Sequence, residues 1–115
     1  MRHHNSNRKF GRVSNKRVAL IRSLAISVIE KGKITTTEAK AKELRPILEK
    51  MVTKARIKTL SHRRLLVARL GGHERATRKL IEEVGPKYEK RPGGYIRITK
   101  LAQRGSRKMA VLEFV

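Results

Sequence analysis

The 115-residue sequence contains no cysteine, and it has few acidic and few aromatic residues. The absence of cysteine excludes a disulfide framework and a thiolate metal site. The spacing of the histidines and acids matches no zinc-binding motif. There is also no nucleophile elbow and no phosphate-cradling glycine loop. The sequence therefore predicts no enzyme, no cofactor and no small-molecule substrate.

Long hydrophobic runs are also absent. The longest apolar-rich stretch covers residues 18–29, and Arg22 lies inside it, so it is too short to cross a bilayer. The basic start followed by this stretch is similar to a signal peptide, but no small-residue cleavage site follows it. An acid-free start with arginine and serine would also suit a mitochondrial transit peptide. The lack of a long presequence favours the bacterial cytoplasm, and we expect no membrane partner.

Positive charge dominates what the sequence does contain. Its 30 lysines and arginines outnumber nine acidic residues, which gives a net charge of +21 and an isoelectric point of about 11.6. Self-repulsion opposes compaction, so such a chain needs a strongly negative partner. Three blocks carry most of the surplus: residues 1–17, 52–72 and 87–108. Several basic blocks on one small chain are the electrostatic footprint of a protein that binds a polyphosphate.

The first of these blocks has almost nothing to bury. Its apolar residues are Met1, Phe10 and Val13, and it has no carboxylate, so packing cannot offset its ordering entropy. We therefore divide the chain into a basic N-terminal extension, residues 1–13, and a single α+β RNA-binding domain, residues 14–115. The extension is expected to stay loose until a polyanion neutralises it.

The domain is predicted to begin with an amphipathic helix. Apolar residues recur at helical spacing over residues 15–31, with Ser14 as the cap and Gly32 as a natural stop. Arg17 and Arg22 fall off the apolar face of this helix, toward solvent or a partner.

A short strand and a second helix are expected next. Residues 33–36 are short and β-branched, and either Thr35 or Thr37 can cap the helix that follows. Thr35 with Glu38 has the spacing of a capping box. Pro46 lies within this helix and removes one backbone donor, so we expect either a kink or two short helices in tandem.

Two further helices are predicted from the third quarter of the chain. Ser61 can cap a helix over residues 61–70, and a second helix covers residues 73–84. Gly85 followed by Pro86 gives the residue order expected where a helix ends.

In the last part of the chain the residue pattern changes from the helical period to a period of two residues. Residues 95–101 and 109–114 alternate like strands, and the basic, polar segment between them suits an antiparallel hairpin with an exposed loop. Helices followed by strands indicate an α+β fold.

DNA and RNA remain as alternative ligands. The Gly-Gly-linked helix pair within residues 61–84 could serve a DNA-binding or nucleoid-type protein. However, Glu74, Glu82 and Glu83 on its second helix would repel a DNA backbone. Four aromatic residues are too few for a base-stacking platform. The composition favours a compact body with basic extensions that bind folded RNA through phosphate, 2′-hydroxyl and shape.

Three stretches make the sequence resemble a known family. The first is MRH with RKFGR, the second is ITTTEAKAK with ELRP after it, and the third is GPKY leading to GGYIRI and the closing MAVLEFV. By these stretches the chain resembles the bacterial-type large-subunit ribosomal protein seventeen family.

The resemblance implies a structural constituent of the large ribosomal subunit that acts in translation. It implies binding to large-subunit ribosomal RNA near the outer end of the nascent-chain tunnel, among neighbouring large-subunit ribosomal proteins, on the cytoplasmic ribosome. It also implies helices packed in two layers on a small three-stranded mixed sheet. No catalytic residue and no cofactor come with the family.

Basic residues and two glycines are the candidate RNA contacts. From the extension and the first helix we select Arg2, His3, Arg8, Lys9, Arg12, Lys16 and Arg17. From the rest of the domain we select Lys40, Lys42, Arg91, Arg97, Lys100, Arg104 and Arg107. Gly93 and Gly94 are added because a glycine lets a sugar–phosphate strand approach the backbone closely.

Overall fold

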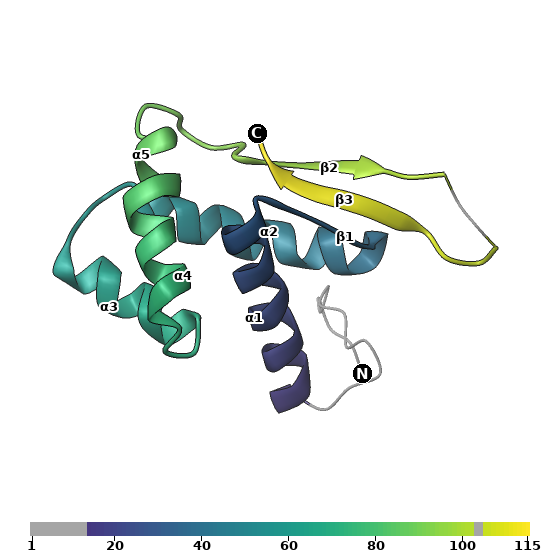
Figure 1. Ribbon diagram of the computed structural model, residues 1–115, viewed down its shortest axis with the longest axis horizontal. Coiled ribbons are helices and arrows are strands. Elements are labelled where there is room, and N and C mark those ends of the chain that lie inside the picture. Colours follow the sequence, from purple (N-terminus) through teal and green to yellow (C-terminus); the bar gives the residue numbers. More distant parts are fainter. Residues whose placement is uncertain (1–13, 103–104) are drawn as a thin grey trace, which may run out of the picture.

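The helix α2 (Glu38–Ala55) lies at the centre of the fold. The computed structural model describes residues 14–102 and 105–115. In Figure 1 the two C-terminal strands (yellow-green and yellow) lie above α2, and the N-terminal helix (dark purple-blue) extends below it. Helix α2 packs against all three strands and against α1 (Ser14–Lys31) and α3 (Leu60–Arg69). These helices and strands confirm the predicted α+β class.

Helix α1 forms as its pattern predicts. Ala25, Val28 and Ile29 are buried on one face at helical spacing. Gly32 follows with φ of +83°, a conformation that glycine adopts without a steric penalty. Its N–H donates to the carbonyl oxygen of Val28 at 2.7 Å, so the helix ends where the sequence predicts.

Helix α2 begins after the short strand β1 (Lys33–Thr37). Thr37 is its cap, because the Thr37 hydroxyl accepts from the Lys40 N–H at 3.3 Å. Thr35 lies in the strand, so the predicted Thr35–Glu38 capping box is wrong. Pro46 has no backbone N–H and therefore removes one helical hydrogen bond, yet α2 is a single continuous helix. Burial of its apolar face against the sheet and α1 holds the two halves together.

Helix α3 and the next helix, α4 (Glu74–Lys79), begin at caps that the sequence did not indicate. The Thr59 hydroxyl accepts from the His62 N–H at 3.2 Å, so Thr59 rather than Ser61 caps α3. His73 caps α4, because its Nδ1 accepts from the Ala76 N–H at 3.1 Å.

The predicted helix end at Gly85 is wrong. After α4 the chain continues through a π-helical turn, η1 (Leu80–Val84), into the short helix α5 (Gly85–Lys87). Gly85 has helical angles, with φ of −55° and ψ of −52°. A Cβ atom on Gly85 would lie 2.6 Å from the carbonyl oxygen of Ala55. Glycine is therefore required here for close packing of α5 on the end of α2.

The sheet has the strand order β1-β3-β2, where β2 is Ile96–Lys100 and β3 is Met109–Phe114. Both pairings are antiparallel, with Ile34 and Ile98 on either side of Leu112. The predicted hairpin of β2 and β3 is confirmed, but the expectation of a mixed sheet is wrong. Strands β1 and β2 run in the same direction, yet β3 lies between them, so no parallel pair forms.

The aromatic residues of the described region are used in the core. The rings of Tyr88 and Tyr95 lie 5.3 Å apart, and Phe114 packs beside Tyr88. The Tyr88 hydroxyl donates to the carbonyl oxygen of Val115. These rings are thus committed to packing the C-terminal strand rather than to stacking on a ligand.

Candidate nucleic-acid interface

Most of the residues predicted to contact RNA lie in the described part of the chain. Arg2, His3, Arg8, Lys9, Arg12 and Arg104 lie outside it. The structure does not gather the remaining candidates in one site. Three separate surfaces hold Lys16, Arg17, Lys42, Arg97, Lys100 and Arg107, whereas Arg91, Gly93 and Gly94 lie in the loop before β2 and Lys40 is half-buried in α2.

The first surface is a cationic group around the start of α2, which we call the Glu38 cluster: Glu38, Lys42, Lys100, Arg107 and Lys108. The Glu38 carboxylate lies 2.8 Å from the Lys42 Nζ and 3.5 Å from the Lys100 Nζ. Arg107 and Lys108 line the same hollow beside Lys42. The cluster brings three predicted contacts together from α2, the end of β2 and the hairpin loop.

Glu38 organises this cluster without neutralising it. The Lys42 hydrogen bond holds the pKa of the Glu38 carboxyl below its ordinary value, and the Lys100 charge lowers this pKa further. One carboxylate among four cationic side chains leaves an excess of positive charge. The sequence identified Lys42, Lys100 and Arg107, but it missed Lys108 and the central position of Glu38. Only the fold brings the hairpin loop to the start of α2.

The second surface is the outer face of the sheet. Arg97 donates through Nε and an η nitrogen to the Glu113 carboxylate, at 3.1 and 3.0 Å. Lys33 stands on the other side of Glu113 in the strand register. Because side chains alternate along a strand, Arg97 and Lys100 point to opposite faces of the sheet. They therefore cannot contact the same phosphate from β2.

The loop before β2 holds the two candidate glycines. Gly93 and Gly94 have φ of +145° and +66°, and a Cβ atom on Gly93 would meet nothing within 4 Å. Arg91 donates through Nε to the Gly93 carbonyl oxygen at 3.2 Å. The backbone conformation thus requires glycine here, and the open space beside Gly93 leaves room for another molecule.

The third surface lies along α1, where Lys16 is exposed and Arg17 is half-buried. Arg17 lies at the rim of a groove between α1, α2 and α3, together with Arg22 and Arg69. We call this the α1–α3 groove. The sequence selected Arg17 as an RNA contact and placed Arg22 off the apolar face, but it missed Arg69, which belongs to a different helix.

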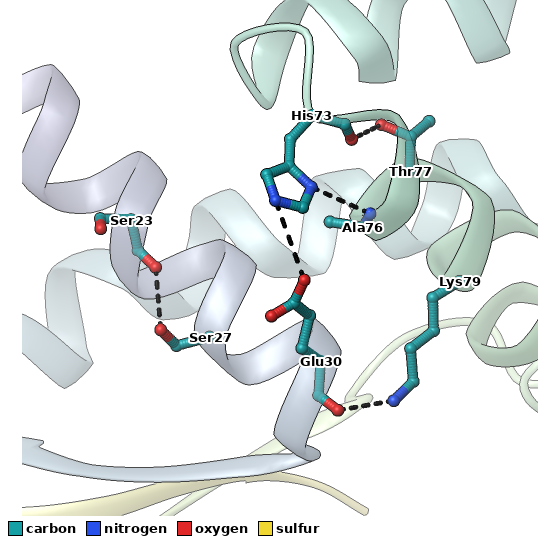
Figure 2. Close-up of polar contacts among 7 residues, drawn as sticks. All are labelled: Ser23, Ser27, Glu30, His73, Ala76, Thr77 and Lys79. Carbon is teal, nitrogen blue, oxygen red and sulfur yellow. Dashed lines mark hydrogen bonds and ion pairs between the residues drawn. The ribbon is translucent and has the colours of Figure 1, made fainter.

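Histidine and lysine side chains between α1 and α4 have structural partners (Figure 2). The Lys79 ammonium donates to the Glu30 carbonyl oxygen at 2.6 Å. The His73 Nε2 lies 3.8 Å from the Glu30 carboxylate, while its Nδ1 caps α4. His73 is thus a helix cap. Across residues 14–102 and 105–115, no group of three acidic or histidine side chains could hold a metal ion.

Comparison with known proteins assigns the chain to a family. A model of the ribosomal protein L17 family matches residues 20–115. The chain belongs to this family. Curated relatives match over nearly their full length, and each of the two that follow is named large ribosomal subunit protein bL17. The relative from Nautilia profundicola is 48% identical over 120 residues, which cover 100% of this chain and 98% of the relative. The relative from Gemmatimonas aurantiaca is 50% identical over 117 residues, with the same coverage.

Membership of the L17 family decides the broad function. Proteins of this family are structural constituents of the large ribosomal subunit, not enzymes, so the chain has a structural role in translation and its place is the ribosome. Within the described residues, no helix combines the length and the apolar character needed to span a bilayer.

Proposed function

We propose that the chain binds large-subunit ribosomal RNA through its N-terminal extension and its basic surfaces. The observation that carries this proposal is the Glu38 cluster, where three lysine or arginine side chains predicted from the sequence meet on one surface. Four cationic side chains repel one another and the single Glu38 carboxylate does not neutralise them, so binding of a polyanion stabilises the arrangement.

Phosphate neutralisation is the proposed mechanism. Lys42, Lys100, Arg107 and Lys108 contact phosphates where two RNA strands approach, and Glu38 keeps the lysine ammonium groups in place before the RNA arrives. Each contact releases counterions from the RNA, which gives the binding free energy its dependence on salt. Folded RNA offers such paired strands together with 2′-hydroxyl groups, so shape contributes to the selection of the site.

The other candidates extend this interface. Residues 1–13 precede α1 in the sequence, so the extension joins the domain a few residues before Lys16 and Arg17. Lys40 in α2, Arg91 in the loop before β2 and Arg97 on the outer face of the sheet add contacts. Gly93 and Gly94 in the same loop as Arg91 allow close backbone approach. Because the surfaces face different directions, we propose that the domain is enclosed by several RNA segments rather than docked on one.

We further propose that the bound RNA lies near the outer end of the nascent-chain tunnel, beside neighbouring ribosomal proteins. Family resemblance supports this location. Cross-linking from a photoreactive residue placed at exposed Thr99 on the outer sheet face tests it, because the products identify the adjacent RNA and proteins. Cross-links only to segments remote from the tunnel would contradict the location.

Sedimentation and competition test the proposed RNA binding together. In a cell extract the chain should migrate almost entirely with large subunits. In a purified system it should prefer a folded large-subunit RNA fragment over duplex DNA of equal length at the same salt concentration. Equal binding to both nucleic acids, with the chain forming dimers, would support the DNA-packaging alternative instead.

A further inference from the structure

The α1–α3 groove differs from the other basic surfaces because its floor is apolar. Val18 and Ile21 come from α1, and Ile47 and Met51 come from α2. Val18 is 52% exposed, although it lies on the side of α1 that faces the other helices. The groove has a volume of about 480 Å³, which is within the range of sites for a single small ligand.

Arginines form the rim of this groove. Arg17, Arg22 and Arg69 surround the floor, and Glu43 is the single carboxylate among them. Arg22 is held in position, because its Nε donates to the Arg69 carbonyl oxygen at 3.2 Å. A Cβ atom on Gly71 would lie 2.7 Å from the Arg22 Cδ, so the absence of a side chain at position 71 leaves room for the aliphatic part of Arg22. The rim is therefore positive and partly preorganised.

An apolar floor under guanidinium groups has the chemistry of a nucleotide site. A base presents a flat apolar face, its phosphate is anionic, and guanidinium groups both pair with phosphates and stack on bases. A basic peptide is excluded by the charge of the rim. An extended acidic peptide would need a longer channel than a groove of this volume. Because Tyr88, Tyr95 and Phe114 pack in the core, the aromatic rings of the described region are not available for stacking.

We infer that the α1–α3 groove binds one unstacked nucleotide of the ribosomal RNA. The base lies against Val18, Ile21, Ile47 and Met51, and the flanking phosphates contact the rim arginines. This inference rests on the proposed RNA binding, and it adds a defined subsite to an interface that otherwise recognises phosphates.

A pair of charge-matched variants tests the inference. Val18→Glu places a carboxylate on the floor of the groove, whereas Leu60→Glu makes the same change at the start of α3, where Leu60 is 63% exposed. Both positions are solvent-accessible and helical, so both variants should fold, which circular dichroism checks. We expect Val18→Glu to bind a large-subunit RNA fragment about five- to a hundredfold more weakly than Leu60→Glu, as expected from the loss of one stacked base.

The outcomes separate this inference from the proposed function. Equal affinities of the two variants, with salt-dependent binding retained, would overturn the nucleotide site and leave RNA binding intact. Equal affinities are also expected if the groove binds a segment of a protein instead of a nucleotide, so this outcome counts against the inference in either case. Absence of salt-dependent RNA binding by the unaltered chain would overturn the proposed function itself.

Isoleucine methyl signals give a second readout on the unaltered chain. Adenosine 5′-monophosphate should shift the signals of Ile21 and Ile47 but not that of Ile57, which is exposed outside the groove. Ribose 5-phosphate carries the same phosphate without a base and should leave all three unchanged. Equal shifts with both compounds, or no shift with either, would contradict a site for the base.

Discussion

The carboxylate of Glu49 in α2 accepts hydrogen bonds from two successive backbone N–H groups, those of Tyr95 and Ile96, at 3.2 and 3.0 Å. Tyr95 is almost fully buried, and Ile96 begins β2. The helix thereby fixes where the strand starts. Arg56 completes the arrangement, because it donates to the Tyr95 hydroxyl at 2.8 Å and to the Glu89 carbonyl oxygen at 2.9 Å.

Removing this carboxylate should destabilise the fold without weakening RNA binding. Glu49→Ala leaves two partly buried N–H groups without their acceptor, which should cost about 1–3 kcal/mol. The variant also raises the net positive charge, so its affinity for RNA should not fall. Chemical unfolding measures the loss of stability, and Glu89→Ala, an exposed acid that makes the same charge change, is the control. Equal stabilities of the two variants would show that the Glu49 contacts contribute nothing.

Replacing Gly85 by alanine should destabilise the protein, whereas the same change elsewhere in helices usually stabilises. Glycine-to-alanine changes within helices normally stabilise, by up to about 1 kcal/mol. At Gly85 the new Cβ would meet the Ala55 carbonyl oxygen, and overpacking of this kind costs about 1–3 kcal/mol. Gly85→Ala should therefore lower the midpoint of urea unfolding. A midpoint that stays the same or rises would contradict the close packing of α5 on α2.

These two sites show which features the sequence could and could not predict. Apolar spacing and Gly32 located α1, and alternating residues located the β2–β3 hairpin, because both signals are local. Gly85 was misread as a helix end because a glycine needed for close packing is identical in sequence to a glycine needed for a turn. The cap at Thr59 was missed because Ser61 lies close by and is an equally good cap in sequence, and the cap at His73 was missed because histidine is not one of the residues preferred at helix N-caps.

The candidate interface was predictable in composition but not in arrangement. Charge imbalance identified Lys42, Lys100 and Arg107, yet nothing local indicates that they meet around Glu38. The separation of Arg97 from Lys100 follows from strand alternation once β2 is known. Arg69 could not be linked with Arg17 from the sequence, because it is the packing of both α1 and α3 against α2 that brings them to one groove.

The lowered pKa of Glu38 gives a pH dependence. A carboxyl whose pKa is lower in the folded than in the unfolded state stabilises the fold above its unfolded pKa, and this stabilisation is lost as the pH falls through the folded pKa. The ordinary value is 4.5. Stability should therefore fall as the pH drops below about 4.5, and Glu38→Gln should show a smaller fall. Thermal unfolding between about pH 6 and 3 measures this difference, and parallel curves for the two proteins would contradict it.

The Glu38 cluster should contribute specifically to RNA binding. Replacing Lys100 and Arg107 together by alanine removes two cationic side chains and should reduce the salt slope by about 0.7–0.9 for each phosphate that is no longer neutralised. Replacing Arg75 and Arg78, two exposed arginines of α4, makes the same charge change away from the cluster. If both double variants changed the slope equally, net charge rather than the cluster would determine the binding.

The N-terminal extension should act as a separate binding element. Deleting residues 1–12 removes basic side chains but no buried residue of the described core, so helical circular dichroism should stay nearly unchanged while RNA affinity falls. Unfolding of the domain by this deletion would contradict the division at residue 13.

Salt dependence of binding is the most direct test of the central claim that cationic surfaces of this chain are neutralised by ribosomal phosphates. The affinity of the full chain for a folded large-subunit RNA fragment should be measured over a range of salt concentrations. The logarithm of the affinity should fall linearly with the logarithm of the salt concentration, with a contribution of about −0.7 to −0.9 for each phosphate contacted. A slope of several units is the predicted result, and a slope near zero would contradict the account.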